Sequence, residues 1–164
     1  DYILKEKRRL SQDNNYACYE TVNLINGDKK IENVRVIGPE RTYTQVEISK
    51  EDASVLGINP PYKNSGDLTG AEEIIIESEK SSIKRKCVIL SNRHIHMNTN
   101  ELGKYNLKNG QVVKLKIDGV KGGVLDNVVI KAKDNYSLEA HLDTDDGNAH
   151  LINKDNNIGE VIYE

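Results

Sequence analysis

The 164-residue chain contains no tryptophan and no phenylalanine, so its aromatic side chains are eight tyrosines. Its formal net charge is −3. A nucleic-acid-binding protein needs clustered Lys and Arg side chains for the phosphates and aromatic rings on which bases stack. The composition therefore argues against a nucleic-acid partner, and the short basic run at residues 84–86 is interpreted as a solvated connection.

Cysteines and long apolar runs are also scarce. Cys18 and Cys87 are too few for a disulfide framework or a Cys-rich zinc site, so both are predicted to be buried free thiols. The longest apolar runs, such as residues 74–76 and 88–90, are far shorter than the roughly 20 residues of a membrane-spanning helix. The first residues lack the pattern of a signal peptide. We therefore expect a globular protein of the cytoplasm with no membrane partner.

Two hairpins are predicted from alternating apolar residues. The strands Thr21–Ile25 and Lys29–Ile37 flank Asn26-Gly27, a dipeptide that accepts the positive φ angles of a two-residue turn. A second strand, Val112–Ile117, is followed by Asp118-Gly119 and a return strand. Much of the chain is therefore expected to be short β-strands.

An internal repeat relates two parts of the chain. Residues 31–36 (Ile-Glu-Asn-Val-Arg-Val) align with residues 125–130 (Leu-Asp-Asn-Val-Val-Ile) so that Asn33 matches Asn127, an offset of 127 minus 33, or 94. Two unrelated strands with a common apolar rhythm are the alternative, because such a rhythm is common. We favour a true repeat.

The same offset, continued without a gap, also aligns residues with carboxylate or imidazole side chains. Glu47 falls on His141, and Asp52 falls on Asp146. Two residues able to bind a metal therefore take equivalent places in the two halves.

Helices are predicted to be few and short. Ser49, followed three residues later by Asp52, resembles a capping box, and the helix that it opens should end at Gly57. Together with the repeat, these patterns predict a mainly β chain of two related β-domains whose boundary lies between Gly70 and Lys86. We place it at 84/85, which gives domains at residues 1–84 and 85–164.

A pair of histidines separated by one residue is the first candidate metal site. In a β-strand, His94 and His96 would project from the same face, about 7 Å apart, and two imidazoles on one face can converge on one ion. Taken alone, such a pair is more often a surface or hydrogen-bonded pair. His141, which alternates with Glu139 and Asp143, is the candidate third ligand, because a catalytic zinc commonly has three protein ligands and an open position.

Other candidates are weaker by spacing alone. His150, nine residues after His141, is interpreted as an exposed histidine of a helix or loop. Arg41 and Glu47 would form a phosphate or oxyanion clamp if a metal lay near them, since a guanidinium makes two charge-assisted hydrogen bonds at once. By spacing alone, an exposed ion pair is the better explanation of these two residues.

Four separated motifs then occur in a characteristic order. They are Gly-Pro-Glu-Arg-Thr-Tyr-Thr-Gln-Val-Glu-Ile-Ser (38–49), Ser-Gly-Asp-Leu (65–68), Arg-His-Ile-His-Met (93–97), and His-Leu-Asp-Thr-Asp (141–145) with Asn148-Ala149. In order and spacing they resemble the PduL family, the phosphate propanoyltransferases or PduL-type phosphotransacylases of propanediol utilisation and related bacterial microcompartments. The resemblance runs from about Tyr2 to Leu151.

The resemblance implies two related small β-barrel domains capped by short helices, with a two-metal centre, usually zinc, between them. It implies that His94, His96 and His141 bind one metal, that Glu47 helps to bind the other, and that Arg41 is the catalytic or phosphate-binding arginine. It also implies reversible transfer of a short acyl group, propanoyl or acetyl, between coenzyme A and inorganic phosphate. The small-molecule partners would be acyl-CoA or acyl phosphate, and phosphate.

The resemblance further implies a homo-oligomer, such as a dimer, with shell or lumen enzymes of a microcompartment as partners and the cytoplasm or the microcompartment lumen as its location. One departure concerns the second metal. The family carries another Ser-Asn-Arg-His-x-His motif near its start, and this sequence has none upstream of Asp1. We therefore expect either a truncated form of a longer protein, with an N-terminally incomplete first domain, or the loss of the second metal site.

Two alternative functions remain open at this point. A non-catalytic metal-binding β-barrel assembly module would keep one metal for structure, and the encoded sequence upstream of Asp1 tests it. A zinc-dependent acyl-CoA hydrolase would use the three histidines around a zinc-bound water, and its activity would not need phosphate. For the transferase, the sequence shows no Ser-His-Asp arrangement, which favours direct transfer in a ternary complex.

Overall fold

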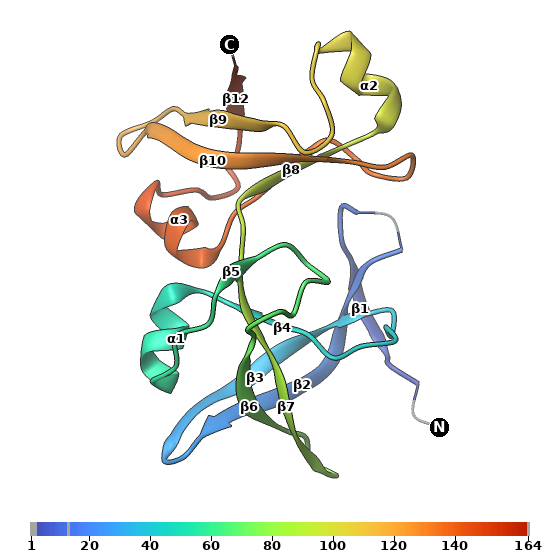
Figure 1. The fold of residues 1–164 in the computed structure, drawn as a ribbon, viewed down its shortest axis with the longest axis vertical. Helices are drawn as coiled ribbons and strands as arrows, with labels where there is room; N and C mark the ends of the chain where they lie inside the picture. Colours follow the sequence, from blue (N-terminus) through green and yellow to red (C-terminus); the bar gives the residue numbers. More distant parts are fainter. Residues whose placement is uncertain (1–2, 13, 164) are drawn as a thin grey trace. The chain divides into compact units, whose positions relative to one another are not determined.

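The computed structural model describes residues 3–12 and 14–163 and shows a mainly β chain whose helices, within these ranges, are short (Figure 1). Tyr2, where the resemblance begins, lies outside the described residues. The chain forms two compact units, Asp1–Ser91 and Asn92–Glu164, each with its own sheet, and one of the sheets is a half-barrel. The predicted mainly β class is confirmed. The predicted domain boundary at 84/85 falls inside β7 (Ser82–Ser91).

The first unit is built on a branched sheet of seven strands. The strand order is β1-β2-β6-β7-β4, with β3 paired to β2 and β5 paired to β7. Besides β7, its elements are β1 (Glu6–Arg9), β2 (Tyr16–Asn26), β3 (Lys29–Gly38), β4 (Val46–Ile48), α1 (Lys50–Leu56), β5 (Tyr62–Lys63) and β6 (Glu72–Glu77). Its buried cluster includes Leu24, Leu56, Ile74, Val88 and Leu90. Cys18 and Cys87 are both buried free thiols, as predicted.

The second unit is built on a sheet of five strands in the order β11-β8-β10-β9-β12. Its elements are β8 (His94–Met97), α2 (Thr99–Lys104), β9 (Val112–Ile117), β10 (Gly123–Ala132), β11 (Glu139–His141), α3 (Thr144–Ala149) and β12 (Gly159–Ile162). Strand β8 lies between β10, to which it is parallel, and β11, to which it is antiparallel. Its core cluster is made largely of residues from β8, β9 and β10.

Both predicted hairpins are confirmed, as β2–β3 and β9–β10. The turn of the first is Gly27-Asp28 instead of Asn26-Gly27, because Asn26 pairs with Lys29 and remains in the strand. The Asn26 amide donates a hydrogen bond to the carbonyl of Leu56 at 2.9 Å, which helps to hold it there. Gly27 takes the positive φ, 62°, that the turn requires.

The predicted helix start and stop are also confirmed in α1. The hydroxyl of Ser49 accepts a hydrogen bond from the backbone N–H of Asp52 at 3.1 Å. Gly57 ends the helix with a left-handed φ of 67°. The helix packs against the sheet through Ala53 and Leu56, both fully buried. None of the described helices is long and apolar enough to cross a membrane.

The repeat is visible in backbone geometry. At corresponding places in the two hairpins the register shifts, where an extra residue on the returning strand forms a β-bulge. These bulges contain Asn33 and Asn127, whose φ angles are 59° and 61°. The helix N-caps Ser49 and Asp143 are separated by the same offset, and each accepts a bond from the backbone N–H three residues later. These matches support a repeat of two related units.

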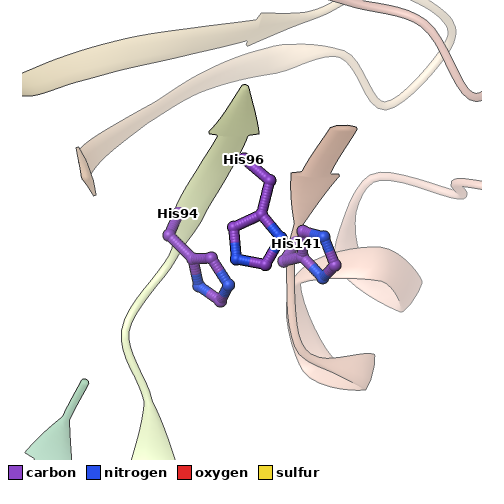
Figure 2. Close-up of side chains that lie close together, drawn as sticks. All are labelled: His94, His96 and His141. Atoms are coloured by element: carbon purple, nitrogen blue, oxygen red, sulfur yellow. The ribbon is translucent and has the colours of Figure 1, made fainter. Parts of the chain in front are cut away.

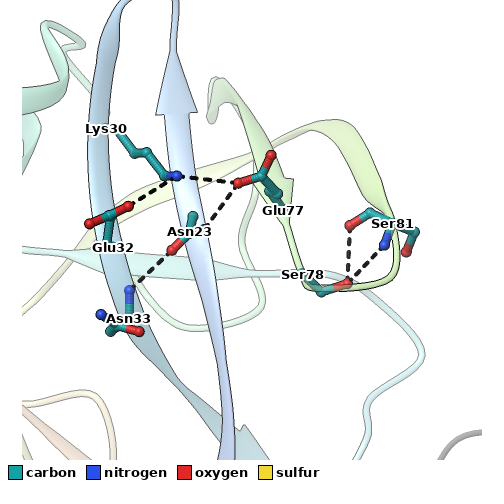
Figure 3. Close-up of polar contacts among 7 residues, drawn as sticks. All are labelled: Asn23, Lys30, Glu32, Asn33, Glu77, Ser78 and Ser81. Atoms are coloured by element: carbon teal, nitrogen blue, oxygen red, sulfur yellow. Dashed lines mark hydrogen bonds and ion pairs between the residues drawn. The ribbon is translucent and has the colours of Figure 1, made fainter.

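Polar contacts surround the first bulge (Figure 3). The backbone N–H of Asn33 donates to Oδ1 of Asn23 at 3.2 Å, and Nδ2 of Asn23 donates to Oε2 of Glu77 at 3.0 Å. Nζ of Lys30 lies 3.1 Å from Oε1 of Glu32 and 3.4 Å from Oε2 of Glu77. The hydrogen bonds from Asn23 and Lys30 lower the pKa of the Glu77 carboxyl. The side chains thus tie β3, β2 and β6 together at the bulge.

The bulge in the second unit is open to a direct test. Asn127→Ala is expected to lower the free energy of unfolding by about 1–2 kcal/mol, because alanine has a Cβ at this left-handed φ but lacks the short polar side chain with which asparagine offsets the strain. Asn127→Gly should be close to neutral, since glycine has no Cβ. Urea denaturation of both variants measures the difference. Equal losses in the two variants would show that the asparagine amide, and not the backbone angle, is what the site requires.

Candidate metal centre

Three histidines project from two neighbouring strands of the second unit (Figure 2). His94 and His96 lie on one face of β8, while Ile95 between them points into the core and is 2% exposed. Strand β11 is antiparallel to β8, and its register pairs His141 with His94 and Glu139 with His96. The alternation of β8 therefore supplies two rings, and the pairing with β11 brings the third to them.

The three imidazole rings are in contact. The ring centroids are 4.8 Å apart for His94 and His96, 4.8 Å for His94 and His141, and 4.3 Å for His96 and His141. One possible ligand atom from each ring lies within 4.8 Å of the others. In a tetrahedral zinc site with Zn–N bonds of about 2.0–2.1 Å, the nitrogens are roughly 3.4 Å apart. The cluster is thus close to the spacing of a metal site.

The hydrogen bond of His94 determines which ring nitrogen can bind a metal. Nδ1 of His94 lies 2.8 Å from the backbone carbonyl oxygen of Asn92. A carbonyl oxygen only accepts, so Nδ1 must carry the proton and donate it. The lone pair is then on Nε2, and the carbonyl holds the ring in its orientation.

The surroundings of His96 strongly lower the pKa of its imidazole. Burial, together with the neighbouring His141 and His94, lowers the pKa of His96 to about 3. The ring is therefore neutral at physiological pH, which is the form that binds metals. Nδ1 of His96 is buried and has no hydrogen-bond partner within residues 3–12 and 14–163. A buried nitrogen without a partner costs about 1–3 kcal/mol, and coordination of a metal would remove that cost.

Other side chains complete the surroundings of the cluster. The ring of Tyr136 stacks on His96 with a centroid distance of 3.9 Å, and the amine of Lys133 lies 5.3 Å from the centroid of Tyr136. Oε2 of Glu139 is 3.2 Å from Nε2 of His141, close but not aligned as a hydrogen bond. Asp143, which alternates with His141 in the sequence, caps α3.

The donor set fits a zinc ion. Three imidazoles on a two-stranded ladder match the common catalytic arrangement of three protein ligands plus an open position. Imidazole nitrogen is a ligand that zinc and neighbouring transition metals accept well, whereas calcium and magnesium prefer oxygen. The arrangement therefore favours a transition metal.

Two sequence expectations near the cluster are corrected. His150 is half-buried instead of exposed, because it forms the C-cap of α3 and its Nδ1 lies 2.8 Å from the carbonyl oxygen of Lys121. It does not belong to the three-histidine group. In the sequence, Leu138, Ala140 and Leu142 alternate with Glu139 and His141, which predicts a strand with an apolar face. Strand β11 has only three residues, and Leu138, which precedes it, is 53% exposed.

Arg41 and Glu47 lie in the first unit and are linked by a chain of hydrogen bonds. Nη1 of Arg41 donates to the hydroxyl of Tyr43 at 3.1 Å and to Oγ of Ser65 at 3.3 Å. Nε2 of Gln45 donates to the same Oγ at 2.8 Å and also to Oε1 of Glu47. Glu47 is exposed in β4, between the buried Val46 and Ile48. The structure thus brings the two predicted residues into one network.

Sequence reasoning missed the residues that make these connections. Gln45 and Ser65 were part of the motifs but had no assigned role, and only the fold shows that Gln45 also accepts a bond from the backbone N–H of Gly66, at 2.7 Å. The contact between Tyr136 and His96 had no sequence signal, because it joins a loop to a strand forty residues earlier (136 minus 96).

Comparison with known proteins gives a consistent result. A family model described as phosphate propanoyltransferase matches residues 1–153. A phosphate propanoyltransferase of Thermotoga maritima is 40% identical over 164 residues, which covers 99% of this chain and 76% of the relative. One from Limosilactobacillus reuteri is 37% identical over 96% of this chain and 75% of its own length. One from Priestia megaterium is 41% identical over 92% of this chain and 70% of its own length.

Zinc is expected to stabilise the protein through the histidine cluster. A ligand that binds only the folded state stabilises it by about 2.7 kcal/mol at one hundred times its Kd, so added zinc should raise the melting temperature. His96→Ala, which removes one ligand, should lose most of this increase, whereas His150→Ala, the same change outside the cluster, should keep it. Calorimetry with and without zinc measures the shift. A zinc response of His96→Ala equal to that of the unmodified protein would contradict the site.

Proposed function

The chain belongs to the phosphate propanoyltransferase family and is an acyltransferase, and we propose that it moves a propanoyl group between coenzyme A and inorganic phosphate with the help of bound zinc. Acetyl is the second candidate acyl group. The observation that carries the proposal is the cluster of three imidazoles in a chain of this family.

His94, His96 and His141 would hold the zinc ion in this proposal. When bound, zinc supplies a Lewis acid for the thioester carbonyl and a soft cation that stabilises a thiolate. The protein prepares the site in advance: the ladder of β8 and β11 fixes the three rings, and the carbonyl of Asn92 fixes the tautomer of His94. Little reorganisation is then needed when the substrate arrives.

Arg41 is proposed to bind the phosphate. Its guanidinium can make two parallel hydrogen bonds to phosphate oxygens, and its contacts with Tyr43 and Ser65 restrict its orientation. A phosphate oxygen would attack the carbonyl carbon of the thioester, the carbon–sulfur bond would break, and coenzyme A would leave as the thiolate. Arg41 would offset the charge that develops on the attacking phosphate and the carbonyl oxygen.

Glu47 is proposed as a ligand of a second metal. The family pattern supplies two further histidines for that metal from another His-x-His motif, and the repeat that aligns Glu47 with His141 supports an equivalent role in the first unit. The hydrogen bond from Gln45 would orient the Glu47 carboxylate. Assembly as a homo-oligomer, and residence in a bacterial microcompartment, belong to the same proposal and rest on the family resemblance.

The substrate proposal has a simple kinetic test. Release of coenzyme A from propanoyl-CoA should require inorganic phosphate and should yield propanoyl phosphate in equal amount, because the acyl group passes directly between the two. Thiol detection together with acyl phosphate detection measures both products. Release that is zinc-dependent but independent of phosphate would instead identify a zinc-dependent acyl-CoA hydrolase.

The role of the arginine is tested separately. Arg41→Lys keeps the charge but loses the planar fork, and it should lower kcat/KM by about 100-fold, within the range for the loss of one donor to a developing oxyanion. Arg35→Lys, the same change at an exposed position of β3, is the matched control and should keep full activity. If Arg41→Lys instead loses thermal stability and retains its kcat/KM, the arginine is structural.

A further inference from the structure

Arg93 precedes the histidine pair and makes an ion pair with a distant helix. Its Nε donates to Oδ2 of Asp146 at 2.7 Å, and its Nη2 donates to Oδ1 of the same carboxylate at 2.7 Å. Asp146 lies in the first turn of α3 and its side chain is only 14% exposed. This is a paired, charge-assisted contact of the kind that fixes orientation as well as distance.

The same arginine also contacts the bulge of β10. Its Nη1 donates to the backbone carbonyl of Asp126 at 3.1 Å, and its own carbonyl accepts a hydrogen bond from the N–H of Val129 at 3.0 Å. Asp126 adjoins Asn127, the residue with the left-handed φ. Arg93 therefore joins the start of β8 to β10 and to α3.

The connection from Asp146 back to the cluster is short. Its backbone N–H donates to Oδ1 of Asp143, the N-cap of α3, at 2.8 Å. Asp143 is two residues after His141 in the chain, and His94 follows Arg93 directly. The ion pair thus bridges the two segments that carry His94 and His141.

We propose that Arg93 and Asp146 are positioning residues for the three-histidine centre, which they serve by holding the β8 and β11–α3 segments at the separation that the metal ligands require. The inference rests on the metal binding proposed above. Neither residue is a ligand in this view. Arg93 acts through the backbone of His94, which follows it directly, and Asp146 acts through Asp143, which lies two residues after His141.

Substitutions that retain size or charge separate positioning from simple charge balance. Arg93→Lys keeps one positive charge but cannot make the two parallel bonds to the carboxylate. Asp146→Asn keeps the shape of the side chain and removes its charge. Glu160→Gln is the matched control, since it disrupts an exposed ion pair with Lys116 in the same unit, away from the histidines.

The experiment measures zinc affinity by competition with a chromophoric chelator, and the melting temperature of the metal-free protein. Arg93→Lys and Asp146→Asn should each raise the Kd for zinc by about 10–100-fold, the usual effect of losing an outer partner of a metal ligand. Glu160→Gln should leave the Kd unchanged. The visible spectrum of bound Co²⁺ should also change in the two variants, because it reports ligand geometry.

Three results would overturn the inference. Unchanged zinc affinity in both variants would remove the positioning role while leaving the proposed metal centre intact. A second contrary result is a loss of zinc affinity that the lower stability of the metal-free protein fully explains, together with an unchanged Co²⁺ spectrum. It would show that the pair stabilises the fold and does not position the ligands. If the unmodified protein bound no zinc, the proposed metal centre and the inference would both fail.

Discussion

The antiparallel pairing of β11 with β8 is the interaction on which the candidate metal centre depends. It sets His141 directly opposite His94, and alternation along β8 then adds His96 on the same face. The opposite face of β8 carries Ile95 and Met97, each 2% exposed, so the strand cannot turn over without exposing both. Burial of Ile95 and Met97 therefore keeps the imidazoles on the face of β8 that points away from the core.

The histidine rings on this ladder differ in how their nitrogens are hydrogen-bonded. The ring of His94 is hydrogen-bonded by a backbone carbonyl, whereas Nδ1 of His96 is buried without a partner among the described residues. A buried histidine cluster is stable when every ring nitrogen has a hydrogen-bond partner. A buried nitrogen without a partner lowers the stability of the fold unless a metal binds it. The Arg93–Asp146 pair supplies the rigidity that such a cluster needs, because it connects both ligand-bearing segments.

Local features were predicted well because their causes are local. The cap at Ser49 and the glycine stop at Gly57 each depend on a few neighbouring residues, and both are confirmed. Helix α2 was missed, although Asn98 and Glu101 form a capping box that was legible in the sequence. The Arg93–Asp146 pair was not predictable in this way, because 53 residues separate its members and no local pattern links them.

The spacing of His94 and His96 was by itself enough to place two rings on one face, since side-chain alternation is a property of any strand. The repeat also identified Glu47 and His141 as equivalent positions. Tertiary structure alone decided that His141 joins the pair, because strand pairing depends on the burial of the whole sheet. It also decided that the equivalent segments differ: β4 runs parallel to β7, whereas β11 runs antiparallel to β8. The two segments, β4 and β11, have similar sequences but pair with different strands. The partner strand determines which side chains lie beside Glu47 and His141.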